Sequence, residues 1–151
     1  MGDAPPTVTI RSAKPPDLAP IVVLDAEITG IEKRAYWEDT YARYARRERR
    51  HFLVAEDLKS SAVKGYIVGE VRAYEFGSEP CGWVVAIGVD PRFRVRRVGE
   101  RLFEAMCERL RGDGVATVRT MVARADVLDM AFFRAQGMMA GPFIELEKPL
   151  D

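Results

Sequence analysis

Hydrophobic and polar residues alternate along several short segments of the chain, which is the two-residue period of a β-strand. Val8 and Ile10 alternate with threonines near the start, and the longest alternating segment runs from residue 65 to residue 75. Residues 82–89 are apolar on both faces, which is typical of a central strand. The segments that this pattern predicts to be strands are residues 7–11, 51–56, 65–75, 82–89, 117–123 and 143–147.

Apolar residues recur every three or four positions in other segments, as they do on one face of an α-helix. The clearest case is a stripe that contains Leu102, Met106 and Leu110. Helices are predicted over residues 17–29, 35–49, 98–111 and 127–136, the first with Asp17 as its N-cap. The order of elements, β-α-α-β-β-β-α-β-α-β, predicts an α/β fold, and the length fits one domain over residues 1–151.

One predicted strand runs into a helix through a short basic loop, in the sequence VVAIGVDPRFRVRRVGERL of residues 84–102. The first N–H groups of a helix have no partner within the helix, and the helix dipole adds positive charge at the same end. The loop also carries four arginines, which are Arg92, Arg94, Arg96 and Arg97. Their fixed charge and the helix start predict a site for an anionic ligand such as a phosphate.

The charged residues of the whole chain balance, with 23 basic and 23 acidic side chains. A chain without net charge has no global attraction to nucleic acid or to an anionic membrane surface, so neither is expected as a partner. The basic residues are nevertheless clustered, with five arginines in residues 43–50. Such a run is most often a solvated helix end, and it otherwise favours a partner with an acidic surface.

The composition also bears on metals and on location. Two cysteines without CxxC spacing and a single histidine are too few for a zinc site, so no metal is expected. No apolar run approaches the ~20 residues of a membrane-spanning helix. The first ten residues lack the basic and then apolar order of a secretory signal, and we expect a cytoplasmic location.

Three segments carry residue patterns that are more specific than their predicted structure. Residues 10–18 read IRSAKPPDL, residues 89–99 read VDPRFRVRRVG, and residues 126–138 read DVLDMAFFRAQGM. In this order they resemble the IRxAxxxDL opening, the V-x-P-x-x-R/Q-x-x-G-x-G/A signature and the N-x-x-A-x-x-F-Y-x-x-x-G-F pattern of the GNAT superfamily of acyl-CoA-dependent N-acetyltransferases. The resemblance implies a mixed, mostly antiparallel central sheet of six to seven strands, flanked by about four helices, with splayed central strands at residues 82–89 and 117–123.

The resemblance implies that coenzyme A binds at the basic loop, with acetyl-CoA as the co-substrate. Backbone N–H groups of residues 95–100 would cradle the pyrophosphate, and the pantetheine arm would pair with the backbone of residues 87–89 as an added strand does. Gly88 would mark a bulge there. The residues implied to bind the cofactor are Ile87, Gly88, Val89, Arg94, Val95, Arg96, Arg97, Val98, Gly99, Glu100, Asp126 and Phe133.

The chain departs from the family pattern at three positions. Arg97 stands where the family has its first loop glycine, which a side chain tolerates if φ stays negative. Asp126 replaces the asparagine, which removes two donors. Phe133 replaces the tyrosine whose hydroxyl commonly protonates the leaving thiolate in members that have it. The sequence therefore supports acyl-CoA binding more directly than turnover.

Acetyl transfer to an amine needs a proton acceptor, because lysine-like amines are mostly protonated at pH 7. Glu70 is the candidate general base, and the alternative is that its carboxylate faces water or pairs with Arg72 or Arg119. Tyr74 is the candidate proton donor in place of the missing tyrosine. Further candidates are Asp25 and Glu27 at the acceptor entrance and Tyr36 as a second proton donor.

The resemblance implies an acyltransferase that moves an acetyl group from acetyl-CoA to a primary amine by direct attack in a ternary complex. The acceptor is a small-molecule amine or a protein amino group, and the residues do not decide between them. The alternative function is a regulatory module that holds acyl-CoA with weak or no catalysis, which the change at Phe133 favours. Homodimers are frequent in the family, so a homodimer is one assembly that the resemblance leaves open.

Overall fold

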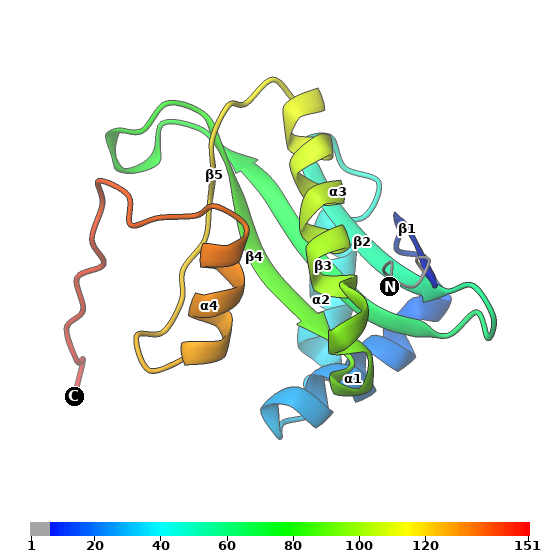
Figure 1. Ribbon diagram of the computed structural model, residues 1–151. Coiled ribbons are helices and arrows are strands. Elements are labelled where there is room, and N and C mark those ends of the chain that lie inside the picture. The colour runs from blue at the N-terminus through cyan, green and yellow to red at the C-terminus, as the bar shows by residue number, and fades with distance from the viewer. Residues whose placement is uncertain (1–6) are drawn as a thin grey trace. The chain divides into compact units, whose positions relative to one another are not determined.

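The computed structural model describes residues 7–151, and its largest element is a mixed five-stranded sheet (Figure 1). The strands lie side by side in the order β1-β2-β3-β4-β5. Neighbours among the first four run antiparallel, whereas β5 runs parallel to β4. The bounds are β1 Val8–Ser12, β2 Arg50–Asp57, β3 Val63–Arg72, β4 Cys81–Val89 and β5 Val118–Arg119.

Four α-helices accompany the sheet in the described part of the chain: α1 Leu18–Thr29, α2 Arg34–Tyr44, α3 Val98–Gly112 and α4 Val127–Ala135. Helix α3 crosses one face of the sheet, while α1 and α2 pack on the other (Figure 1). The predicted apolar stripe of α3 is buried, with Leu102 and Met106 both 0% exposed. The predictions of an α/β fold and of about four helices are confirmed. None of the helices in residues 7–151 has the length and apolar character needed to cross a membrane.

The chain forms two compact units, Met1–Thr120 and Met121–Asp151. The first unit holds the whole sheet together with α1, α2 and α3, and the second holds α4. One domain over residues 1–151 stays a prediction.

The sheet has fewer strands than the six to seven expected, since five are present in residues 7–151. The predicted strand at 117–123 is reduced to Val118–Arg119. Residues 143–147 are not a strand, because a strand needs a hydrogen-bonded neighbour and this segment is not among the paired strands of the described chain. Ile144 and Leu146 of that segment are 83% and 86% exposed, so its alternating pattern is not matched by alternating burial.

The second helix is also shorter than predicted, because α2 ends at Tyr44 rather than at residue 49. A turn follows in which Arg46 and Arg49 have φ of 55° and 64°. Two left-handed residues so close together are incompatible with a continuing right-handed helix. The arginine run therefore forms a turn at the surface instead of a helix end.

Helix α3 packs closely on the sheet because glycines face it from β3 and β4. A Cβ atom at Gly69 would lie 2.8 Å from the Sδ atom of Met106 and 2.9 Å from the carbonyl oxygen of Trp83. A Cβ atom at Gly82 would lie 2.5 Å from a methyl carbon of Leu110. Carbon contacts are normally about 3.5–4.0 Å, so a side chain at either position forces α3 or the sheet to move.

We expect Gly69→Ala to lower the free energy of unfolding by about 1–3 kcal/mol, because the added methyl meets a backbone carbonyl as well as Met106. Urea unfolding monitored by circular dichroism measures the loss. Gly112→Ala is the matched control, since a Cβ atom there has no neighbour within 4 Å and Ala favours the helix. Equal stability of the two variants would contradict the close packing of α3.

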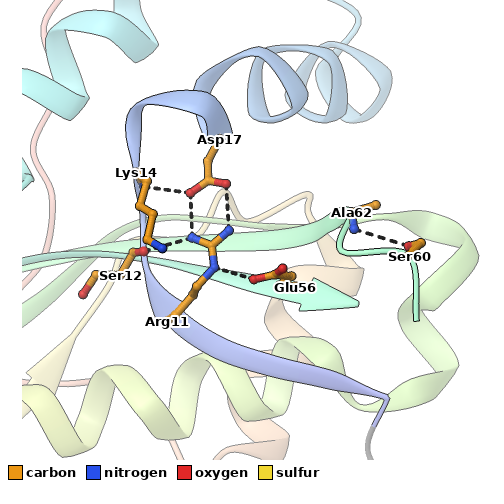
Figure 2. A network of polar contacts seen from close by, with 7 residues as sticks. All are labelled: Arg11, Ser12, Lys14, Asp17, Glu56, Ser60 and Ala62. Carbon is orange, nitrogen blue, oxygen red and sulfur yellow. Dashed lines mark hydrogen bonds and ion pairs between the residues drawn. The ribbon is translucent and has the colours of Figure 1, made fainter. Parts of the chain in front are cut away.

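Arg11 joins β1, the segment before α1, and β2 (Figure 2). Its two Nη atoms donate to the two carboxylate oxygens of Asp17 at 2.8 and 2.9 Å, and its Nε atom donates to Glu56 at 2.5 Å. The backbone N–H of Lys14 also donates to Asp17, at 2.7 Å. In the described chain Asp17 holds the predicted N-cap position without a side-chain bond to α1, because its carboxylate closes this turn instead. Burial opposes its ionisation, but the hydrogen bonds from Arg11 and Lys14 hold the pKa of Asp17 below its usual value.

We expect Asp17→Asn to reduce the free energy of unfolding at neutral pH by about 1–3 kcal/mol, because the bidentate pair with Arg11 is lost. The pKa of Asp17 is lower in the folded state, so its contribution is complete above the unfolded value of about 3.9 and is lost as pH falls through the folded value. The difference from wild type should therefore shrink below about pH 4. Thermal unfolding of both proteins from neutral to acid pH tests this. The exposed Asp39→Asn provides the control, and a difference that stays constant with pH would refute the assignment.

Candidate functional site

The loop from β4 to α3 begins at a buried aspartate. Asp90 follows the last residue of β4 and is 3% exposed. Its carboxylate accepts hydrogen bonds from the backbone N–H of Arg92 at 3.0 Å and from the Nε and Nη2 atoms of Arg92 at 2.9 and 3.0 Å. The guanidinium bonds lower the pKa of Asp90 although burial opposes this. Arg92 also lies 3.7 Å from Glu27, so part of its charge, which the sequence assigns to an anionic ligand, is balanced by two carboxylates of the chain itself.

Helix α3 follows directly on a residue with a left-handed backbone. Arg97 has φ 61° and ψ 24°, so the condition under which a side chain is tolerated here without strain, a negative φ, is not met. A non-glycine residue in this conformation is strained by roughly 1–2 kcal/mol. The guanidinium of Arg97 pairs with Glu100 at 2.6 Å, and this hydrogen bond lowers the pKa of Glu100. Part of the charge of Arg97 is therefore balanced within the loop.

The first turn of α3 offers backbone donors. Among the hydrogen bonds of the described residues, the N–H of Arg101 donates to the carbonyl of Arg97 at 3.1 Å. The N–H groups of Val98, Gly99 and Glu100 precede this bond, and helix geometry leaves such groups for an external acceptor. The backbone of residues 94–96 lies in the short 3-10 helix Pro91–Arg96, and the side chains of these three residues are outside what the structure describes.

Strand β4 is paired along its whole length on one side and only at its start on the other. Strand β3 pairs with it from Cys81 to Val89, whereas β5 pairs with Gly82 and Trp83. In the described chain, residues 84–89 have no strand partner on the β5 side. This agrees with the expected divergence of the two strands. The edge that carries Ile87 and Val89 can therefore pair with an extended chain that contains amide groups.

The bulge in β4 lies at Val85. The register between β3 and β4 shifts at Val68 and Gly69 and leaves Val85 as the extra residue. The expectation of a bulge at Gly88 is therefore wrong. Glycine is needed at position 88 because a Cβ atom there would lie 2.5 Å from the hydroxyl oxygen of Tyr66.

Glu70, the candidate general base, lies on β3 with its carboxylate between two guanidinium groups. Its two oxygens lie 3.0 Å from the Nε atom of Arg72 and 3.5 Å from the Nε atom of Arg50. Tyr44 lies close to this carboxylate, and burial together with the charge of Glu70 raises the pKa of Tyr44. The alternative pairing with Arg72 is confirmed, whereas Arg119 donates to a serine hydroxyl at 2.7 Å. The Glu70 side chain keeps 14% of its surface exposed.

Two aromatic rings complete this part of the site. The guanidinium of Arg72 lies 5.2 Å from the ring centre of Trp83, and that of Arg50 lies 5.7 Å from the ring centre of Tyr44. Arg50 and Trp83 are the cross-strand partners of Glu70 on β2 and β4. Knowledge of the strand register would have identified them as neighbours of Glu70, but an alternating pattern in the sequence does not determine the register. We call Tyr44, Arg50, Glu70, Arg72 and Trp83 the Glu70 cluster.

Tyr74, the candidate proton donor, lies beyond the end of β3. The strand ends at Arg72, and Tyr74 has φ 65° in the turn that follows, with 74% of its surface exposed. No hydrogen bond in the described part of the chain joins Tyr74 to Glu70. The other candidate donor, Tyr36, is 46% exposed and packs edge-on against Trp37 at 5.1 Å.

Asp25, a candidate for the acceptor entrance, is held inside the core by three donors. Its carboxylate is within 3.0 Å of the Trp37 indole N–H, 2.9 Å of the Lys33 ammonium and 3.4 Å of the Tyr66 hydroxyl. Burial first, and then the charge of Asp25, raise the pKa of Tyr66. Since these partners come from the α1–α2 connection, α2 and β3, Asp25 joins these elements.

The remaining two predicted cofactor residues lie in the second unit. Asp126 precedes α4 and caps it, with its Oδ1 atom accepting from the N–H of Asp129 at 3.0 Å. Phe133 is 5% exposed, and its ring packs edge-on against Phe132 at 5.1 Å.

The chain matches the model of the acetyltransferase (GNAT) family over residues 19–138. A match over so much of the sequence shows that the chain belongs to this family. No curated protein sequence matches it.

Solved structures share the fold at low sequence identity. The aminoglycoside N-acetyltransferase AAC(6')-Iy in complex with CoA has a TM-score of 0.81 at 16% identity, over 99% of this chain and 97% of that one. A transcriptional regulator from Bacillus halodurans C-125 has a TM-score of 0.79 at 15% identity, over 95% and 99%. Ard1 from Thermoplasma volcanium has a TM-score of 0.72 at 23% identity, over 87% and 82%. At such identities these likenesses show the fold alone.

The strain at Arg97 predicts that glycine at this position gives a more stable protein than alanine, the reverse of the order at an ordinary helix position. Arg97→Ala and Arg97→Gly both remove the pair with Glu100, but only glycine relieves the positive φ. We therefore expect the glycine variant to be more stable than the alanine variant by about 1 kcal/mol, as judged by urea unfolding. In an ordinary helix position the order is reversed by a similar amount. An alanine variant at least as stable as the glycine variant would show that the position is not left-handed.

Proposed function

We propose that this chain is an N-acetyltransferase that moves the acetyl group of acetyl-CoA to a primary amine by direct attack in a ternary complex. The observation that carries the proposal is the junction of β4 and α3. In the described chain β4 has no strand partner on the β5 side at residues 85–89, beyond Val84, whose carbonyl accepts from the Thr120 hydroxyl at 2.9 Å. This edge leads through a fixed loop into the first turn of α3, where helix geometry leaves N–H groups without helical partners. A strand edge suits an amide-containing arm, and a helix start suits a phosphate.

We assign the cofactor contacts by the kind of atom that makes them. The pyrophosphate accepts from the N–H groups of the first turn of α3 and the loop before it, and the pantetheine arm pairs along the β4 edge. The proposed cofactor residues are Ile87, Gly88, Val89, Arg94, Val95, Arg96, Arg97, Val98, Gly99, Glu100, Asp126 and Phe133. Most of these contacts are made by backbone atoms, so they tolerate Arg97 in the position of a family glycine.

In the proposed reaction the amine nitrogen attacks the thioester carbonyl carbon, a C–N bond forms and the C–S bond breaks. Glu70, directly or through a water molecule, accepts the proton that the amine loses, and Tyr74 donates a proton to the departing thiolate. The bulge at Val85 lies close in sequence to Trp83, the cross-strand partner of Glu70, and this places the distorted part of β4 near the proposed base. The acceptor is a small-molecule amine, as the aminoglycoside acetyltransferase fold neighbour suggests, or a protein amino group.

A second function is supported by Phe133, which has no hydroxyl to protonate a thiolate. In that case the chain binds acyl-CoA as a regulatory module with weak or no catalysis. Acyl-CoA binding is common to both functions, and release of the free thiol separates them.

We expect acetyl-CoA to raise the melting temperature, because ligand at 100 times its dissociation constant adds about 2.7 kcal/mol to the stability of the folded state.

With a panel of amines, we expect free thiol to be released, and Glu70→Gln to lower kcat by about 100-fold or more. Glu75→Gln is the matched control, since the exposed Glu75 carboxylate lies 4.0 Å from the same Arg72. A melting temperature unchanged by saturating acetyl-CoA would reject both functions. Stabilisation without thiol release from any amine would favour the regulatory module.

A further inference from the structure

A shallow, open hollow lies at the turn between α2 and β2. It has a volume of about 650 Å³, and the residues that line it are Ala42, Arg43, Arg47, Glu48 and Arg50. Three of the five are arginines, against one glutamate. Nothing in the proposed cofactor site accounts for this surface.

The charge of the hollow is not balanced locally. Residues 43–50 carry five arginines and one glutamate, and all six side chains are exposed. Arg43 pairs with Asp39 at 3.2 Å, and Arg50 pairs with Glu70. In the described chain no acidic group lies within 4 Å of the guanidinium of Arg46 or Arg47. A chain with no net charge therefore has a concentrated positive surface here.

The turn beside the hollow holds arginine where other residues fit the backbone better. Arg46 and Arg49 have left-handed φ of 55° and 64°, a conformation that glycine and asparagine adopt more readily. Arginine therefore has no conformational advantage in such a turn, and its contribution is its charged side chain. Strained residues at the surface are more frequent at functional sites, and here the strained residues are the charged ones.

Arg50 belongs to both the hollow and the Glu70 cluster. Its Nη1 atom donates to the carbonyl of Arg43 at 2.9 Å, while its Nε atom faces Glu70 at 3.5 Å. A ligand in the hollow is thus separated from the proposed base by one guanidinium.

We propose that this hollow binds an acidic peptide segment, and that the segment is the part of the acceptor next to the amine. The second half of this proposal rests on the proposed acetyl transfer. Carboxylates match the planar donor fork of guanidinium groups, whereas a polycationic acceptor meets like charge. Nucleic acid fits less well, because single-stranded binding needs exposed aromatic rings for base stacking and the ring beside these arginines, Tyr44, is 5% exposed.

Binding is tested with a fluorescein-labelled peptide rich in Asp and Glu that has a free amino terminus, measured by fluorescence anisotropy without cofactor. Arg43→Glu/Arg47→Glu should weaken it by about tenfold or more, and the milder Arg43→Gln/Arg47→Gln by less. Arg34→Glu on the same helix is the matched control, because the Arg34 and Arg43 side chains are each 57% exposed. Melting temperatures confirm that each variant is folded.

Three binding results would overturn the proposal. They are equal loss in the Arg34 variant, affinity for a neutral or Lys-rich peptide that matches the acidic one, and tighter binding of a single-stranded oligonucleotide. Complete displacement of the peptide by low concentrations of inorganic phosphate would instead define a site for small anions and would likewise overturn it.

The acceptor role is tested separately by thiol release from acetyl-CoA with the same unlabelled peptide. The charge-reversed variant should raise the KM for the peptide by about tenfold and leave the KM for acetyl-CoA unchanged. Arginine-dependent binding without thiol release from any amine would retain the hollow as a peptide site and reject the acetyl transfer. Turnover of neutral amines with no effect of charge reversal would retain the enzyme and reject the hollow as its acceptor site.

Discussion

The close packing of α3 against the sheet is the constraint on which the proposed cofactor site depends. Glycines stand on β3 and β4 opposite the stripe of α3, and the side chains they face recur every four residues along the helix: Leu102 opposite Gly65, Met106 opposite Gly69 and Leu110 opposite Gly82. This contact sets both the depth and the direction of the helix axis. The start of α3 therefore lies at the end of β4, where Asp90 and Arg92 fix the path of the loop between them. The backbone donors are therefore positioned by packing along the whole of α3, from Gly65 next to the loop to Gly82 near the end of the helix.

The opposite face of the sheet is built on a different principle. There Tyr66 covers Gly88 and reaches Asp25, whose carboxylate is held among the α1–α2 connection, α2 and β3. Further along β3 the same face carries Glu70, with guanidinium groups and aromatic rings around it. A buried carboxylate needs its donors, and breaking one such contact is far more harmful than replacing the whole set. This face is thus polar at defined points, which suits recognition. On the α3 face the close contacts to glycines dominate, with polar contacts such as the pair between His51 and Asp113 at 2.7 Å beside them.

The helices and strands with a strong hydrophobic period were predictable from the sequence. The features that depend on which segments lie next to one another in space were not. Helix α3 and strand β4 follow from their patterns, and the IRxAxxxDL opening has its physical explanation in the Arg11–Asp17 pair that closes the turn after β1. The bulge at Val85, by contrast, is a property of the β3–β4 register, which alternation does not encode. The positive φ of Arg97 was missed because the residue type argues against it. Residues 143–147 alternate like a strand, yet a strand exists only where a neighbour accepts its hydrogen bonds.

Fold similarity at about 15% identity says more about cofactor binding than about recognition of the acceptor in the proposed reaction. A cradle of backbone N–H groups and an open strand edge survive almost any change of side chain, so cofactor binding can be shared by distant relatives. Recognition of the acceptor is made by side chains, and side chains are what such relatives do not share. Arg47 and Arg50 are therefore better evidence for the acceptor of this chain than any neighbour of the same fold. Since Arg50 also contacts Glu70, a change in acceptor charge and a change in the environment of the proposed base are physically coupled here.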